Sequence, residues 1–205
     1  TLYKITFLND TVGYVCGTNG TVLKTTNSGL TWTSIGIPTS LNFLSMSFIN
    51  QDTGWIVGGN GTYPYSLFGE NGILIRTFDG GKSWIVDNSY NYTLSSVFLI
   101  DKDTGYISLN SYTFSIIKKT VNGGSSFSTI LYDSLITVFC SNIYFLTPQI
   151  GYYISNAIPG NNTDGIFKTN DFGKTWNKVI TNYSIISSCI MDSCVLFYTY
   201  SDMPG

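Results

Sequence analysis

A two-part pattern that recurs four times restricts the fold of this chain more than any other feature of its sequence. The first part is an apolar run, a turn, and a Gly-aromatic pair; the second is the octapeptide Thr-x-(Asp/Asn)-x-Gly-x-x-aromatic. The pairs are Gly13-Tyr14, Gly54-Trp55, Gly105-Tyr106 and Gly151-Tyr152, and the octapeptides span 25–32, 77–84, 120–127 and 169–176. A period of roughly 45 residues is typical of repeat architectures, in which each unit buries its faces against its neighbours.

Each repeat contains four short runs of strand-forming residues separated by turn residues. In the second repeat they are 44–49, 54–58, 73–77 and 83–86. The octapeptide suits the turn between the third and fourth strands, because its Asp or Asn accepts backbone N–H groups and its Gly supplies a positive φ. The sequence therefore predicts an all-β fold, a β-propeller of four-stranded antiparallel blades.

We expect one β-propeller over residues 1–205, with blades at about 3–36, 42–88, 94–131 and 141–181 and a partial blade at 186–205. The partial blade has two expected strands, 186–192 and 194–200, so the chain holds about four and a half blades. Since unpaired strand backbone needs a partner, we expect further sequence, or another chain, to pair with 195–200. A closed five-bladed ring is the alternative.

The octapeptides resemble the Asp-box, or bacterial neuraminidase repeat. With the preceding Gly-aromatic pair, the whole unit is similar to the repeat of photosystem II stability/assembly-factor-like propellers, over about residues 3 to 180. The resemblance implies a larger ring, commonly seven blades, and a structural role for the boxes. The corresponding box positions are Asn27, Gly29, Trp32, Asp79, Gly81, Trp84, Asn122, Gly124, Phe127, Asp171, Gly173 and Trp176.

The charged residues exclude several classes of function. The chain has no histidine, which removes the commonest general base and every His-containing metal site. Arg76 is its only arginine, so nucleic acid is not an expected partner, and the arginine cluster that a sialidase needs is missing. No carboxylates occur at calcium-loop spacing. We expect no metal and no cofactor.

A glycoside hydrolase needs only two carboxylates and remains an alternative. Glu70 is the only glutamate, and it follows an aromatic-rich segment, which would suit an acid of raised pKa. An exposed loop glutamate is more commonly only solvated. We therefore predict that the protein is not an enzyme.

The order of strands in a meander places the longest insertions on the face opposite the boxes, because successive connections alternate between the two faces. Aromatic residues are concentrated there, and rigid rings suit stacking on a sugar or anchoring a protein; covering blade edges is the alternative role. The predicted ligand-binding residues are Tyr63, Tyr65, Phe68, Glu70, Tyr90, Tyr92, Tyr112 and Phe114.

The four cysteines include no C-x-x-C. Cys189 and Cys194 flank a short turn, so we predict a hairpin disulfide between them, and free buried thiols at Cys16 and Cys140. No apolar stretch is long enough for a transmembrane segment. A surface poor in charge and rich in Asn, Ser and Thr, together with the resemblance, predicts a secreted or cell-surface protein.

The sequence thus favours a non-enzymatic binding or scaffold propeller that engages a protein or a glycan through the face opposite the boxes. The resemblance implies assistance to a membrane complex, but the photosynthetic members carry an arginine-rich patch, and the single arginine disfavours that role. A filament or surface-layer subunit that self-associates is a further alternative.

Overall fold

The computed structural model describes residues 1–61, 70–111, 114–134, 138–157, 165–181, 184–191 and 194–200, and its regular elements there are all β-strands. They form four four-stranded sheets and one two-stranded sheet. Blade 1 comprises β1 (Leu2–Phe7), β2 (Gly13–Gly17), β3 (Thr21–Thr25) and β4 (Thr33–Gly36); blade 2 comprises β5 (Asn42–Phe48), β6 (Gly54–Gly59), β7 (Gly72–Thr77) and β8 (Ile85–Tyr90). Blade 3 comprises β9 (Leu94–Leu99), β10 (Gly105–Asn110), β11 (Ser115–Thr120) and β12 (Ser128–Asp133); blade 4 comprises β13 (Val138–Phe145), β14 (Gly151–Ala157), β15 (Gly165–Thr169) and β16 (Asn177–Thr181). The last sheet pairs β17 (Ser184–Met191) with β18 (Cys194–Tyr200).

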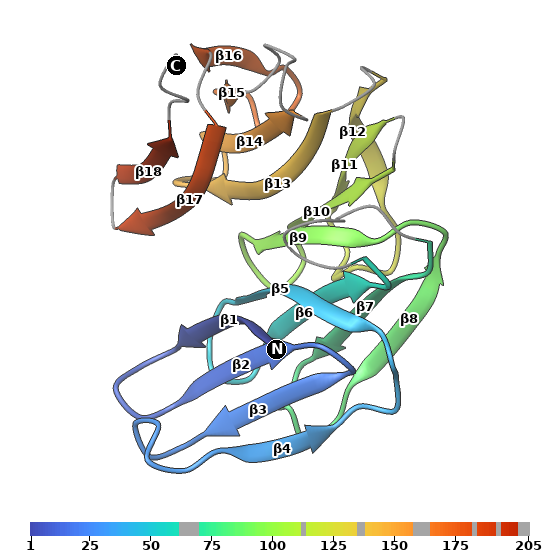
Figure 1. Cartoon of the computed structure of the whole chain (residues 1–205), viewed down its shortest axis with the longest axis vertical. Coiled ribbons are helices and arrows are strands. Elements are labelled where there is room, and N and C mark those ends of the chain that lie inside the picture. Colours follow the sequence, from blue (N-terminus) through green and yellow to red (C-terminus); the bar gives the residue numbers. More distant parts are fainter. Residues whose placement is uncertain are drawn as a thin grey trace, which may run out of the picture.

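The sheets are arranged side by side around a common axis, with β1, β5, β9, β13 and β17 nearest the middle and the fourth strands outermost (Figure 1). Neighbouring strands in every sheet are consecutive in the chain and antiparallel. The prediction of a β-propeller of four-stranded antiparallel blades is therefore confirmed. Within the described residues β18 is paired only with β17, and the expectation of a further strand beside it stays a prediction.

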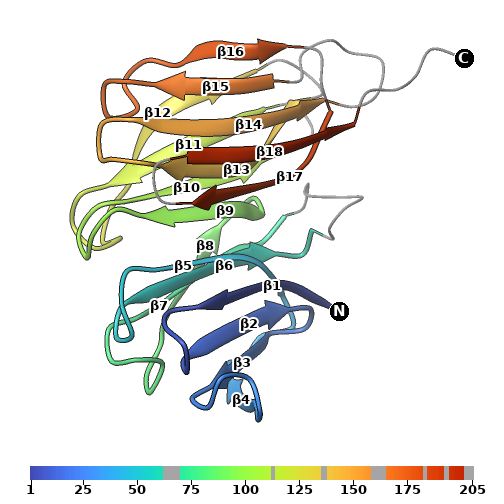
Figure 2. The same ribbon diagram turned by 90° about the vertical axis from the view of Figure 1, so that its left-hand side faces the viewer.

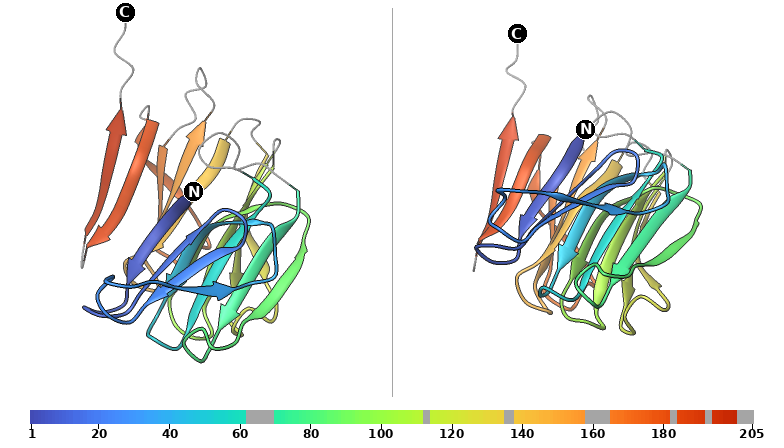
Figure 3. Two further views of the ribbon diagram at one scale, coloured as in Figure 1. Left: turned by 60° about the horizontal axis from the view of Figure 1, so that its bottom comes forward. Right: turned by 90° about the horizontal axis from the view of Figure 1, so that it is seen from below.

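The connections between strands lie at two opposite ends of the blades, as the side views show (Figures 2 and 3). One end, called here the box face, carries the octapeptide turns and the connections between first and second strands. The other, called the loop face, carries the connections between second and third strands and those between blades. The first residue of the chain also lies at the loop face.

The hydrophobic core is divided into layers between successive blades. Between blades 1 and 2, Tyr14 packs with Phe43 and Ile56. Equivalent layers contain Trp55 with Leu94 and Ile107, and Tyr106 with Ile143 and Tyr153. Since these three layers are each shared by two sheets, the stability of a blade depends on its neighbour.

Candidate functional site

The Asp or Asn of each octapeptide is bonded within its own turn. In blade 2, Asp79 Oδ1 accepts the Ser83 N–H and the Thr77 hydroxyl, each at 2.9 Å, and the Thr77 Oγ1 accepts the Gly81 N–H at 2.8 Å. Gly81 has a φ of +81°, as the turn requires. The same bonds recur in blades 1, 3 and 4. This geometry supports the predicted structural role of the boxes.

Asn replaces Asp in two boxes without loss of a bond, because the neighbouring hydroxyl reverses its role. The Ser83 hydroxyl donates to Asp79 Oδ2 at 2.6 Å, whereas the Thr31 hydroxyl accepts from Asn27 Nδ2 at 2.9 Å. Hydrogen bonds from Ser83 hold the pKa of Asp79 down at about 2, and those from Thr175 do the same for Asp171. A carboxylate this acidic is a poor proton donor or base near neutral pH.

A repeated contact, called here the joint, connects the boxes of blades 2, 3 and 4 to the blade before each of them. At the first joint, the Gly80 carbonyl of blade 2 accepts the Tyr14 hydroxyl at 2.9 Å and the Lys24 ammonium at 2.6 Å, both from blade 1. The ammonium also lies 5.3 Å from the centre of the Tyr14 ring.

The later joints keep this design with different residues. Arg76 donates to the Gly123 carbonyl at 2.7 Å, and Tyr106 donates to the Phe172 carbonyl at 3.2 Å. In each case a ring from the Gly-aromatic pair lies opposite a cation on the third strand, since Tyr14 pairs with Lys24, Trp55 with Arg76 and Tyr106 with Lys119. The sequence carried this signal, because a Lys or Arg directly precedes the Thr of all four boxes.

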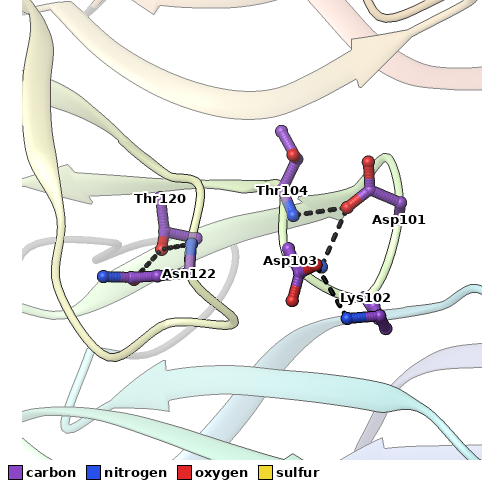
Figure 4. A network of polar contacts seen from close by, with 6 residues as sticks. All are labelled: Asp101, Lys102, Asp103, Thr104, Thr120 and Asn122. Carbon is purple, nitrogen blue, oxygen red and sulfur yellow. Dashed lines mark hydrogen bonds and ion pairs between the residues drawn. The ribbon is translucent and has the colours of Figure 1, made fainter.

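The connections between first and second strands are also held by hydrogen bonds, both within themselves and to the box of the same blade. In blade 3, Asp101 Oδ1 accepts the N–H groups of Asp103 and Thr104 at 2.8 and 2.6 Å, as Figure 4 shows beside the box residues Thr120 and Asn122. The Asp103 carbonyl then accepts the Gly123 N–H of the box at 2.9 Å.

Three aromatic rings form a connected cluster at the loop-face end of blade 3. Phe114 packs edge-on against Tyr92, with ring centres 4.9 Å apart, and stacks on Tyr132 at 5.5 Å. Tyr132 is 60% exposed, whereas Tyr92 and Phe114 are half-buried. We call these three residues the aromatic cluster. Tyr132 was not among the predicted residues, because it lies within an outer strand and does not belong to an insertion.

The other predicted ligand-binding residues have varied positions. Tyr90 lies between blades 2 and 3, its ring 6.5 Å from that of Phe127, and burial raises its pKa. This agrees with the alternative that some rings cover blade edges. Glu70 is exposed at the loop face. The remaining predicted positions lie outside the described residues; they are Tyr63, Tyr65, Phe68 and Tyr112.

The buried thiols have no visible chemical role. Cys16 and Cys140 are free and buried, and burial raises the pKa of each to about 12. For the predicted disulfide, the strand register pairs Cys189 with Leu196 and Cys194 with Met191, and the cysteine side chains lie outside what the structure describes. That disulfide stays a prediction.

Among the described residues, no three His, Cys, Asp or Glu side chains come together as a group that could hold a metal ion. The described part of the chain likewise contains no helix with the length and apolar character needed to span a bilayer.

The fold and the octapeptide turns together define an Asp-box β-propeller. Residues 27–190 match the family described as photosynthesis system II assembly factor YCF48, so the chain belongs to that family. It is 37% identical over 71 residues to the photosystem II assembly protein Ycf48 of Thermosynechococcus vestitus, a match covering 32% of this chain and 17% of that protein. It is 34% identical over 91 residues to the photosystem II stability/assembly factor HCF136, chloroplastic, of Oryza sativa subsp. japonica, covering 40% of this chain and 19% of that protein.

Two solved structures show the fold at low identity. One is described as YCF48 bound to D1 peptide, with a TM-score of 0.54 and 16% identity, covering 97% of this chain and 76% of that chain. The other is the GH74 enzyme of Niastella koreensis, with a TM-score of 0.68 and 15% identity, covering 97% of this chain and 35% of that chain.

The prediction of a secreted or cell-surface protein is wrong. The family and both curated relatives are photosystem II assembly factors, one of them described as chloroplastic. The composition misled because hydroxyl and amide side chains bond the turns of every blade, as Thr25 and Asn27 do, so their abundance reflects the repeat. The single arginine likewise does not place the chain outside the family.

Proposed function

We propose that this chain is a non-enzymatic scaffold that binds an extended protein segment at its loop face, and that the segment belongs to a photosystem II subunit. The aromatic cluster carries this proposal. Tyr132 offers a ring that is 60% exposed and held in place by stacking on Phe114, an arrangement suited to anchoring a partner at low entropic cost.

The relatives supply the class of partner. Both curated relatives are named as photosystem II assembly factors, and a structurally similar YCF48 has been solved with a D1 peptide. Binding such a segment requires an exposed surface with rigid rings. It does not require a catalytic group.

The chemistry of the described residues also favours binding over catalysis. The box carboxylates of Asp79 and Asp171 are bonded within their turns. Glu70 is exposed, whereas the acid of a glycosidase lies in an apolar pocket.

The test is a binding titration with fluorescein-labelled peptides that together cover the D1 subunit, followed by fluorescence polarisation. We expect Tyr132→Ala to raise the dissociation constant of the best-bound peptide roughly tenfold, as for an anchoring aromatic residue. Phe78→Ala is the matched control, because Phe78 is an aromatic residue on the box face, 44% exposed. It should leave the affinity unchanged.

Three outcomes would overturn the proposal. Equal losses in both variants would mean that the rings matter only for stability, which thermal melting of each variant would reveal. Turnover of chromogenic glycosides that disappears in Glu70→Gln would favour a glycoside hydrolase, and selective binding on a glycan array would favour a sugar ligand.

A further inference from the structure

The cations of this chain are distributed unevenly between the two faces of the propeller. All ten Lys and Arg residues lie in the described part of the chain, and none belongs to a loop-face connection. Most occupy the boxes or the strand ends beside them. They are Lys4 in β1, Lys24, Arg76, Lys118, Lys119 and Lys168 in third strands, Lys82 and Lys174 in boxes, Lys102 in the β9–β10 connection, and Lys178 in β16.

The charged side chains that the structure describes at the loop face are carboxylates. Glu70 is exposed in the β6–β7 connection, and Asp133 ends β12 directly after Tyr132 of the aromatic cluster. Asp133 is also paired in register with Ser115, which follows Phe114, so it lies beside two rings of the cluster. Residues 62–69, 112–113, 135–137 and 158–164, which the structure does not describe, contain no Lys or Arg.

The cations at the box face are too far away to neutralise the carboxylates at the loop face. β7 has six residues, which corresponds to roughly 20 Å of extended strand between the two faces. The Debye length at physiological salt is about 8 Å, so charges at the box-face ends of the strands are largely screened from a ligand at the loop face.

We propose that the loop face selects neutral or basic protein segments and rejects acidic ones. The preferred segment presents an apolar or aromatic residue to the aromatic cluster, with any flanking charge supplied by Lys or Arg next to Asp133 and Glu70. This inference rests on the proposed function for the nature of the partner. The sign of the electrostatic potential at the loop face, however, can be measured without any peptide.

The first experiment measures that sign by NMR. Cationic and anionic nitroxides of equal size are added to the intact protein, and relaxation of each backbone amide is compared between the two probes. At the amides of Glu70, Tyr92 and Ser134, the cationic probe should cause roughly twofold more relaxation or better. At Lys82 and Lys174 on the box face, the ratio should be smaller. A ratio of one or less at the loop-face amides would overturn the inference.

The second experiment measures selectivity. The best-bound D1 peptide is synthesised with a Lys-Gly-Lys or a Glu-Gly-Glu tail and titrated at low and high salt. We expect the basic tail to bind roughly tenfold more tightly at low salt and the difference to shrink at high salt. Equal affinities, or tighter binding of the acidic tail, would refute it.

Variants assign the effect to named residues. The pair Glu70→Gln and Asp133→Asn should reduce the tenfold ratio to about twofold, since exposed ion pairs contribute a few-fold each. The matched pair Asp10→Asn and Asp52→Asn, on the box face, should leave the ratio unchanged; if it lowers the ratio equally, the inference is wrong. If no peptide binds while the nitroxide ratios hold, the proposed function fails and the charge asymmetry stands.

Discussion

The joint between blades 1 and 2 predicts a measurable coupling between two side chains that share one acceptor. The buried Gly80 carbonyl accepts both the Tyr14 hydroxyl and the Lys24 ammonium, at 2.9 and 2.6 Å. Tyr14→Phe removes one donor and leaves the other, so it should lower the free energy of unfolding by about 1 kcal/mol. Lys24→Met should have a similar effect, because the hydroxyl then satisfies the carbonyl.

The double variant should lose more than the sum of the two single variants. With both donors gone, the Gly80 carbonyl is buried without a partner, and an unsatisfied buried group costs about 1–3 kcal/mol. We therefore expect a coupling of at least about 1 kcal/mol, measured by equilibrium urea unfolding of the four proteins of the cycle. Chemical denaturation is suitable because one kcal/mol corresponds to only about 2–4 °C in melting temperature for a chain of this size.

The third joint provides a graded control. There the Phe172 carbonyl accepts Tyr106 and Lys119 at 3.2 and 3.5 Å, and Phe172 is exposed. Since solvent can replace a lost donor at this position, the same cycle with Tyr106→Phe and Lys119→Met should give a coupling near zero. Additive losses at the first joint, or equal couplings at both, would refute the reasoning.

Three further predictions concern the boxes and the core. Because the pKa of Asp79 and Asp171 is lowered to about 2 in the folded protein, their contribution to stability is present above pH ~4 and is lost as the pH falls toward 2. The melting temperature of Asp79→Asn should therefore fall less steeply than that of the unchanged protein over this pH range. An equal slope in the two proteins would contradict this. Gly124→Ala should lower the free energy of unfolding more than Gly29→Ala does. Both glycines have φ near +80°, but a Cβ at Gly124 would lie 2.7 Å from the Arg76 guanidinium and 3.0 Å from the buried Trp55 ring, whereas a Cβ at Gly29 would have no atom within 3.6 Å other than those of its chain neighbours. We expect losses of about 3 and about 1 kcal/mol by urea unfolding, and the reverse order would refute the reasoning. Cys140 is fully buried and its pKa is raised to about 12, so peptide mapping after thiol alkylation at pH 8 should find it modified only in denaturant.

The repeat made the fold predictable from the sequence. Each octapeptide fixes a turn by local chemistry, with Thr and Asp or Asn supplying acceptors and Gly supplying the positive φ, as at Thr77, Asp79 and Gly81. Because the Gly-aromatic pair and the octapeptide recur at a regular spacing, they identify the strands, the turns and the order of the blades. The layers between blades follow, because a small sheet needs a neighbour to bury its faces.

The candidate site was less predictable, because no repeated motif marks it. The parity of the meander correctly placed Glu70 and Phe114 at the loop face, but it could not show that Tyr90 turns toward Phe127 in the layer between blades. Tyr132 was missed because its role depends on contact with Phe114, which directly precedes the neighbouring strand and lies 18 positions earlier in the chain. Contacts of this kind depend on strand register, which the sequence pattern alone left undetermined.

The direction of the joints has a consequence for synthesis on the ribosome. The boxes of blades 2, 3 and 4 contact a ring or a cation of the blade before them, as Gly80 contacts Tyr14 and Gly123 contacts Arg76. During translation the preceding blade has already emerged when the next box appears, roughly 2–9 s later at 5–20 residues per second. We therefore expect the blades to fold in order from the N-terminus, each packing against the folded blade before it. The growing chain then exposes, at its growing end, only the face that the next blade will cover.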